Sequence, residues 1–210
     1  MNEEPEGRSR RRRADGEVSR ARILDAATEI AAQRGYEGTS IAAVSSRCGL
    51  PASSIYWHFK DKDDLLAAVI ERSFGSWLTA WQMPPDGAPV DRATTAATQI
   101  AKALLDAPDF IRLGLMLALE RRPVEPRARA MFLHARAQAY QEELTTFGQL
   151  APNLADDSRH LLVTYALAGA DGLFIAKEIG GDAVDLIELF EVHARAVYDA
   201  AVRMIEEQNA

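Results

Sequence analysis

Residues 39–62, TSIAAVSSRCGLPASSIYWHFKDK, constrain the fold more than any other stretch of the chain. Ile41, Val44 and Cys48 follow one another at intervals of three and four residues, which places one apolar stripe along a short helix. Gly49 then supplies the backbone freedom that a tight turn requires, and the proline two residues later has a preset φ that opens a new helix. The stretch therefore predicts two short helices joined by a tight turn.

The second short helix begins with small and polar residues and ends with aromatic ones. Ile55 and Phe59 are four residues apart and are expected to face the core, which leaves the residues between them on the exposed side. Two helices that meet steeply through such a turn form a helix-turn-helix, whose second helix fits the major groove of DNA. The alternative interpretation is an ordinary helical corner in which the aromatic side chains merely pack.

Candidate DNA contacts follow from this arrangement. Serines at the start of the second helix can approach base edges, and a tyrosine and a histidine one turn later can reach phosphates. Asp61 and Asp64 are expected to cap the next helix, whose first lysine would form an anion site, and Ser53 is a candidate cap of the second helix. Thr39 is expected to cap the first helix and to offer its hydroxyl to a phosphate. The predicted contacts in this unit are Thr39, Ser53, Ser54, Tyr56, Trp57, His58 and Lys62.

The segment ahead of this unit is basic. Residues 1–17 are polar and are expected to form a disordered arm, whose arginines, Arg10 and Arg12 among them, would enter an adjacent minor groove. A solvated tail that adds only non-specific attraction is the alternative. The first helix is predicted from about Val18 to Arg34, with Ser19 as its cap and Gly35 as its end.

The helix-turn-helix resembles the signature of the tetracycline-repressor-like (TetR-type) transcription regulators. That family usually shows a threonine, an Ile-Ala, an Ala-Gly-Val, a Leu-Tyr-x-His-Phe and a Lys-x-x-Leu at these intervals. The chain departs from the pattern at Ser45, Pro51 and Ser53, where the family has alanine, serine and often glycine. The resemblance covers residues 19–66 and rests on Thr39, Val44, Cys48–Leu50, Ile55–Phe59 and Lys62–Leu65.

The resemblance implies a homodimer that binds a double-stranded DNA operator. It further implies a repressor that a small-molecule effector releases from DNA through the helix shared by both halves. A DNA-binding regulator without a small-molecule effector, constitutive or controlled by a protein partner, is the alternative.

Composition agrees with an all-α fold, because helix-forming residues dominate and no alternating apolar run is present. The whole chain has a formal charge of −7, but residues 8–60 contain 10 Lys or Arg against 5 Asp or Glu, a local charge of +5. The predicted organisation is a basic arm at 1–17, a three-helix DNA-binding domain at 18–66, and a helical effector-binding and dimerisation domain at 67–210.

Other kinds of chemistry lack a signature. The single cysteine, Cys48, excludes an intrachain disulfide, and its helical phase favours a core position over a redox sensor. The four histidines lie far apart and no nucleophile and base pair is recognisable, so we expect no metal, no cofactor and no enzyme. The chain has no leader-like start and no long apolar run, which predicts a cytoplasmic protein without a membrane partner.

Beyond residue 62 the periodicity predicts helices at about 62–81, 91–106, 109–120, 126–149, 157–178 and 183–207. The helix at 109–120 is apolar nearly all round and is expected to be central and to line a cavity. The predicted cavity residues are Trp81, Phe110, Met116, Glu120, Met131 and His134. The last two helices are expected to pair with a second copy through Tyr165, Gly169, Gly172, Phe190 and Val197, and an intramolecular core is the alternative.

Overall fold

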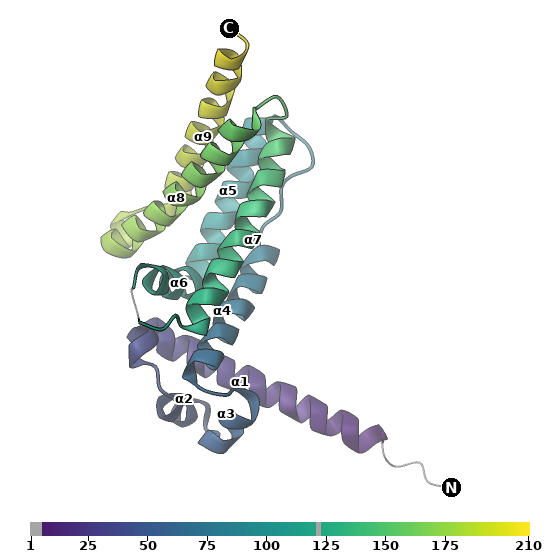
Figure 1. Cartoon of the computed structure of the whole chain (residues 1–210), viewed down its shortest axis with the longest axis vertical. Helices are drawn as coiled ribbons and strands as arrows, with labels where there is room; N and C mark the ends of the chain where they lie inside the picture. Colours follow the sequence, from purple (N-terminus) through teal and green to yellow (C-terminus); the bar gives the residue numbers. More distant parts are fainter. Residues whose placement is uncertain (1–5, 121–122) are drawn as a thin grey trace. The chain divides into compact units, whose positions relative to one another are not determined.

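The computed structural model describes residues 6–120 and 123–210, with side chains from residue 14 onward within these ranges. All regular structure in them is helical, as predicted (Figure 1). The helices are α1 (Glu6–Gly38), α2 (Ile41–Cys48), α3 (Ala52–His58), α4 (Lys62–Thr79), α5 (Pro89–Asp106), α6 (Asp109–Leu119), α7 (Arg127–Leu150), α8 (Asp156–Gly180), the 3-10 helix η1 (Gly181–Ala183) and α9 (Leu186–Gln208). None of these helices combines the length and apolar character needed to cross a membrane.

The chain divides into two compact units. Unit 1 contains the residues up to Ser73 together with Arg112–Leu133, and unit 2 contains Phe74–Ile111 and His134–Ala210. The division differs from the predicted boundary at residues 66 and 67, because it falls within α4 and assigns a later segment to unit 1. Helices α4, α6 and α7 each contribute residues to both units.

The core of unit 1 is formed by α1, α2, α3 and the first turns of α4. Ile23, Val44, Ile55 and Leu65 are completely buried in it, so the apolar stripes predicted for α2 and α3 do face inward. Cys48 lies in the same core and is a free thiol, which agrees with its predicted structural role.

Helix α1 is longer than predicted. It begins at Glu6 rather than near residue 18, and Ser19 is not its cap, because the Ser19 hydroxyl donates to the Asp15 carbonyl within the helix at 2.9 Å. The expectation of a disordered arm was therefore wrong for residues 6–17, whose arginine, glutamate and alanine residues favour helix and which contain no proline. Residues 1–5 lie outside the described part. At the other end the predicted stop is present, because Gly35 interrupts the helix with a φ of 66°.

In unit 2, α9 lies along α5 and α8 (Figure 1). Asp185 caps α9 by accepting from the backbone N–H groups of Ile187 and Glu188 at 2.9 and 3.1 Å. Helix α6 is less central than predicted, because its Leu119 is 79% exposed. An apolar composition does not require burial on every side, and here only one side of the helix is covered.

Candidate nucleic-acid interface and cavity

The turn between α2 and α3 has the geometry that its sequence requires. Gly49 adopts a left-handed φ of 66° and donates its backbone N–H to the Ser45 carbonyl at 3.0 Å. The Ser45 hydroxyl donates to the Leu50 carbonyl at 2.7 Å, so the serine that replaces the usual alanine of the TetR-type pattern fastens the turn. Pro51 occupies the N-cap position of α3 without a side-chain hydrogen bond, and Ser53 lies inside the helix, so Ser53 is not the cap.

The outer face of α3 carries exposed aromatic side chains. Tyr56 is 57% exposed and Trp57 is 76% exposed, whereas Ile55 between them and the turn is completely buried. The alternative of a corner whose aromatic residues all pack inside is therefore wrong for these two. Ser53 on the same helix is also exposed, and Ser54 is half-buried. The helix thus presents a hydroxyl and two rings outward from a rigid base, as a helix that reads DNA must.

His58 completes this face with a neutral imidazole. Its ring meets the Trp57 ring edge-on, with 4.6 Å between centroids. Partial burial, with a smaller contribution from the nearby Arg20 guanidinium, lowers the pKa of His58 from its ordinary value of 6.5. The side chain can therefore donate one hydrogen bond to a phosphate at neutral pH without adding a positive charge.

Thr39 does not have the predicted role. It is 1% exposed, and its hydroxyl donates to the Gly35 carbonyl at 2.8 Å. The N-cap of α2 is the next residue, Ser40, whose hydroxyl accepts from the Ala43 N–H at 3.2 Å. The interruption of α1 at Gly35 leaves a carbonyl that needs a donor inside the protein, and Thr39 supplies it, so its hydroxyl is not offered to a phosphate.

Lys62 is half-buried and has partners within the protein. Its ammonium donates to the Tyr36 carbonyl at 3.1 Å, lies 4.5 Å from the centre of the Tyr36 ring and is 3.5 Å from the Glu37 carboxylate. A phosphate contact by Lys62 would compete with all three.

The predicted cap of α4 is confirmed. Asp61 accepts from the Asp64 N–H at 2.9 Å, and Asp64 accepts from the Lys60 N–H at 3.1 Å. Two carboxylates therefore satisfy the start of this helix, which disfavours the anion site that we expected there.

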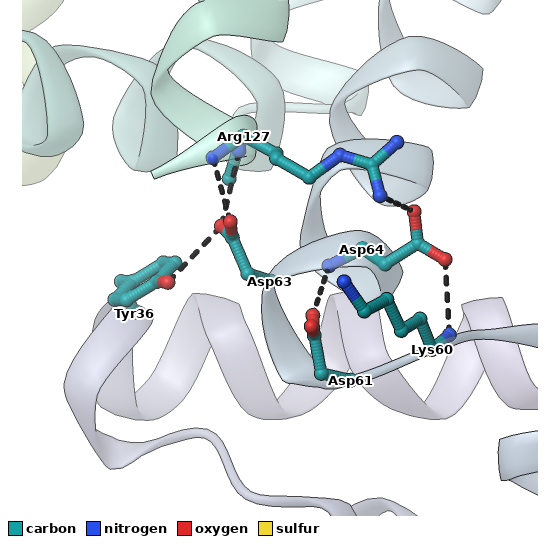
Figure 2. A network of polar contacts seen from close by, with 7 residues as sticks. Tyr36, Lys60, Asp61, Asp63, Asp64 and Arg127 are labelled. Atoms are coloured by element: carbon teal, nitrogen blue, oxygen red, sulfur yellow. Dashed lines mark hydrogen bonds and ion pairs between the residues drawn. The ribbon is translucent and has the colours of Figure 1, made fainter. Parts of the chain in front are cut away.

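Asp63 lies at the centre of a polar network in unit 1 (Figure 2). Its carboxylate accepts from the Tyr36 hydroxyl at 3.0 Å and from the backbone N–H groups of Arg127 and Ala128 at 2.6 and 3.1 Å. The neighbouring Asp64 forms an ion pair of 2.7 Å with the Arg127 guanidinium. The start of α4 thereby caps the start of α7, where a negative charge is favoured. Sequence reasoning missed this role of Asp63 because its partners lie more than 60 positions further along the chain.

Unit 2 contains a cavity of about 140 Å³ whose wall is almost entirely apolar. All six helices from α4 to α9 line it, and aromatic rings form much of the wall. Those rings include Phe74, Trp77, Trp81, Phe110, Phe147 and Phe190.

Few polar groups line this cavity. Arg136 of α7 and Asp171 of α8 form an ion pair at 2.8 Å. Burial raises the pKa of Asp171, and the Arg136 charge opposes that effect. Glu143 has neither a hydrogen bond nor an ion pair within the described residues, and burial raises its pKa from 4.5 to about 7. The cavity thus contains one paired and one unpaired carboxylate.

Two of the six predicted cavity residues, Trp81 and Phe110, line the cavity. Met116, Glu120 and Met131 do not, because the later part of α6 and the start of α7 belong to unit 1. His134 does not either, since its side chain is exposed and the cavity-lining residues of α7 begin at Arg136. Sequence reasoning missed Trp77, although its spacing of four residues from Trp81 was a usable signal. Nothing in the sequence distinguishes Glu143 from its exposed neighbours.

The predicted dimer residues fall into two groups. Tyr165 is exposed, and Gly172 has no atoms within 4 Å of the position a Cβ would take, so both remain candidates for contact with a second copy. Phe190 and Val197 are buried inside unit 2 and line the cavity, which corrects their assignment. Gly169 serves packing within the chain, because a Cβ there would lie 2.3 Å from the His193 ring of α9.

The unpaired carboxylate of Glu143 predicts a dependence of stability on pH. Because the folded pKa of about 7 exceeds the unfolded value of 4.5, the folded state retains a proton that the unfolded state loses. The melting temperature is therefore expected to fall as pH rises from about 4.5 to about 7. Glu143→Gln should flatten this slope, whereas Glu142→Gln at the exposed neighbouring position should not. An unchanged slope in Glu143→Gln would show that other groups cause it.

The region of the chain that matches known proteins in sequence contains the helix-turn-helix. Residues 23–69 match the family described as bacterial regulatory proteins, tetR family. The transcriptional regulator AcrR of Shigella flexneri is 35% identical over 65 residues, which are 31% of this chain and 30% of that protein. The transcriptional repressor KstR of Rhodococcus jostii is 32% identical over 85 residues, 40% of each chain. The chain thus matches less than half the length of these curated relatives.

The fold of almost the whole chain is shared with solved structures. The transcriptional regulator FadR of Bacillus subtilis, solved in complex with stearoyl-CoA, has a TM-score of 0.72 at 15% identity and covers 86% of this chain and 98% of its own. The region that matches in sequence contains the buried stripes of α1 to α3, the left-handed Gly49 and the exposed face of α3. Residues 23–69 thus form a helix-turn-helix domain of the kind found in bacterial regulatory proteins of the tetR family.

Proposed function

We propose that this protein is a homodimeric repressor that leaves its operator when a small molecule occupies the cavity of unit 2. The observation that carries the proposal is the cavity itself, which is lined by apolar side chains and a few polar groups, as ligand sites generally are. The relatives support both parts of it, because KstR is named a repressor and FadR was solved with a bound acyl-CoA.

The path from ligand to DNA would run through helices that contribute to both units. Phe74 and Trp77 of α4 and Trp81 just after it line the cavity, and the first turn of α4 carries Asp63, which caps α7. A ligand that shifts α4 or α7 would change the hydrogen bonds of Asp63. Because the first turns of α4 pack in the core of the helix-turn-helix, such a shift would also move α2 and α3. A coupling of about 1–3 kcal/mol between the two sites changes affinity roughly 5- to 150-fold, which suffices for a switch.

Exposed apolar side chains on α8 support the homodimer. Tyr165 and Ile179 are more than half exposed, as is Leu161 at the start of the same helix. Pairing of two copies through this helix and α9 would bury these side chains in a four-helix interface with two-fold symmetry. Sedimentation at micromolar concentration should give a dimer, and Ile179→Glu should shift it toward the monomer.

The proposal is tested by release of DNA. A duplex is first selected from a random pool with the wild-type protein, and compounds are then screened for a rise in melting temperature with ligand concentration. A compound that stabilises the protein should lower its affinity for the duplex at least five-fold. The variant Ala97→Phe, which fills the cavity from α5, should keep DNA binding and lose the response. Stabilising compounds that leave DNA affinity unchanged would contradict the proposal.

Sequence preference should depend on the serines of α3. Changing Ser53 or Ser54 is expected to alter which duplex is preferred, by about 1–3 kcal/mol for each base pair that is read. Changing Lys60, whose side chain is exposed beside α3, should instead weaken binding to all duplexes alike and flatten its salt dependence. Selection from a random pool with each variant distinguishes the two effects. Unchanged relative preferences in both serine variants would mean that another face of α3 meets the bases.

A further inference from the structure

The cavity of unit 2 contains a carboxyl group that has no counter-charge within the described residues. Glu143 of α7 is half-buried and lines the cavity, and the described residues give its carboxylate no hydrogen bond and no ion pair. A carboxylate that faces a mostly apolar cavity without a partner loses part of its hydration, so proteins usually pair such groups. The Arg136 guanidinium on the same helix is already paired with Asp171 at 2.8 Å, which leaves Glu143 without a counter-charge.

Aromatic rings surround the same space. Trp77 and Trp81 line the cavity with 6.2 Å between their ring centroids, and Phe74 stacks against Trp77 with 6.0 Å between centroids. The indole N–H groups of both tryptophans are buried and have no hydrogen-bond partner. Faces of aromatic rings attract cations, most strongly for tryptophan and where water is excluded.

The remaining titratable groups of the cavity wall come from three helices and do not complete a pair with Glu143. They are Arg136 on α7, Asp171 on α8, and His193 and Tyr198 on α9. The Nε2 atom of His193 lies 2.9 Å from the Ala166 carbonyl, so this ring has a partner of its own. The lining residues of α4, α5 and α6 are all aliphatic or aromatic, so these three helices add no charged group to the wall.

We infer that the effector of this protein is a small hydrophobic cation, such as a quaternary ammonium or a substituted amine, whose charge pairs with Glu143 and lies against the rings of Trp77 and Trp81. The inference rests on the proposed function, since it names the ligand class of the same cavity. The apolar wall favours a ligand with a hydrophobic body, and the unpaired carboxylate favours one with a positive charge. An anionic ligand would meet the ionised Glu143 carboxylate and should bind more weakly than the cation.

The test uses three probes that share a benzyl group but differ in charge. Benzyltrimethylammonium is the cation, neopentylbenzene is its neutral isostere, and phenylacetate is the anion. Binding is followed by calorimetry and by tryptophan fluorescence, since two of the three tryptophans of the chain line the cavity. The cation should bind the wild-type protein more tightly than the anion does. Glu143→Gln should weaken binding of the cation at least ten-fold and change binding of the neutral isostere less than two-fold.

The pH dependence of binding to the wild-type protein gives a second readout. Because burial raises the pKa of Glu143 to about 7, a permanent cation binds the ionised form and must displace a proton at lower pH. Affinity for benzyltrimethylammonium should therefore fall about ten-fold from pH 8 to pH 6. Glu143→Gln should remove this dependence, whereas Glu142→Gln should retain it. A dependence that persists in Glu143→Gln would assign it to another group and overturn the inference.

The outcomes separate the ligand class from the proposed function. If the cation binds in the predicted way and leaves DNA affinity unchanged, the ligand class stands and release by an effector fails. If phenylacetate or neopentylbenzene binds and releases DNA while the cation does neither, release stands and the ligand class fails. Equal binding of the cation to wild-type protein and to Glu143→Gln also overturns the inference.

Discussion

Replacing Tyr56 and Trp57 together with alanine is expected to abolish specific DNA binding and to leave the fold intact. Both side chains are more than half exposed, so their removal costs the folded state little. Each direct contact with DNA contributes about 1–3 kcal/mol, and a dimer would lose every contact twice. Affinity for the selected duplex, measured by fluorescence anisotropy, should therefore fall by at least 100-fold.

A matched variant separates loss of contact from loss of fold. Leu105→Ala removes another exposed apolar side chain, but from α5 in unit 2, and should leave DNA affinity unchanged. The double variant should keep the wild-type melting temperature within a few degrees and the wild-type oligomeric state. Near-normal affinity in a folded double variant would show that the exposed face of α3 is not the DNA-binding surface.

Replacing Asp63 with alanine is expected to weaken both stability and release by the effector. The substitution leaves the Tyr36 hydroxyl and the N–H groups of Arg127 and Ala128 without their acceptor. Loss of a helix cap costs about 0.5–2 kcal/mol, and further unpaired donors add to it. The free energy of unfolding in urea should fall by about 1–3 kcal/mol, and the ligand-induced change in DNA affinity should shrink.

Asp25→Asn is the control for this prediction. Asp25 forms an ion pair with Arg72 at 2.7 Å in the same unit, but the pair lies largely at the surface, where such pairs contribute about 0–1 kcal/mol. Its removal should therefore have a smaller effect than Asp63→Ala and leave the response to ligand unchanged. If Asp63→Ala retains full stability and full response, the network around Asp63 is neither a cap nor a link.

The fold could be predicted from the sequence because its signals are local. The stripe of Val44 and Cys48, the left-handed turn at Gly49 and the Asp61 and Asp64 cap all depend on residues a few positions apart. Local rules failed where neighbouring residues compete for one role. Ser40 rather than Thr39 caps α2, because the interruption at Gly35 directs the Thr39 hydroxyl inward.

The cavity could be predicted only in part, because its wall joins residues that are distant in the chain. The aromatic character of Trp81 and Phe110 indicates a place in the cavity wall. The helical phase of α6 and α7 does not show which of their turns belong to unit 2. Glu143 carries no sequence signal, because its importance comes from the absence of a counter-charge among the side chains around it. The role of Asp63 depends in the same way on a partner more than 60 positions away.

Methylation protection of guanine N7 in the selected duplex tests the central claim most directly, because this atom lies in the major groove. Two recognition helices held by one dimer should protect two half-sites on one face of the duplex, with centres about 34 Å apart or at a multiple of that distance. Protection of two such major-groove patches, lost in the Tyr56 and Trp57 double variant, is the predicted result. A single patch, or binding without any protection in the major groove, would contradict the account.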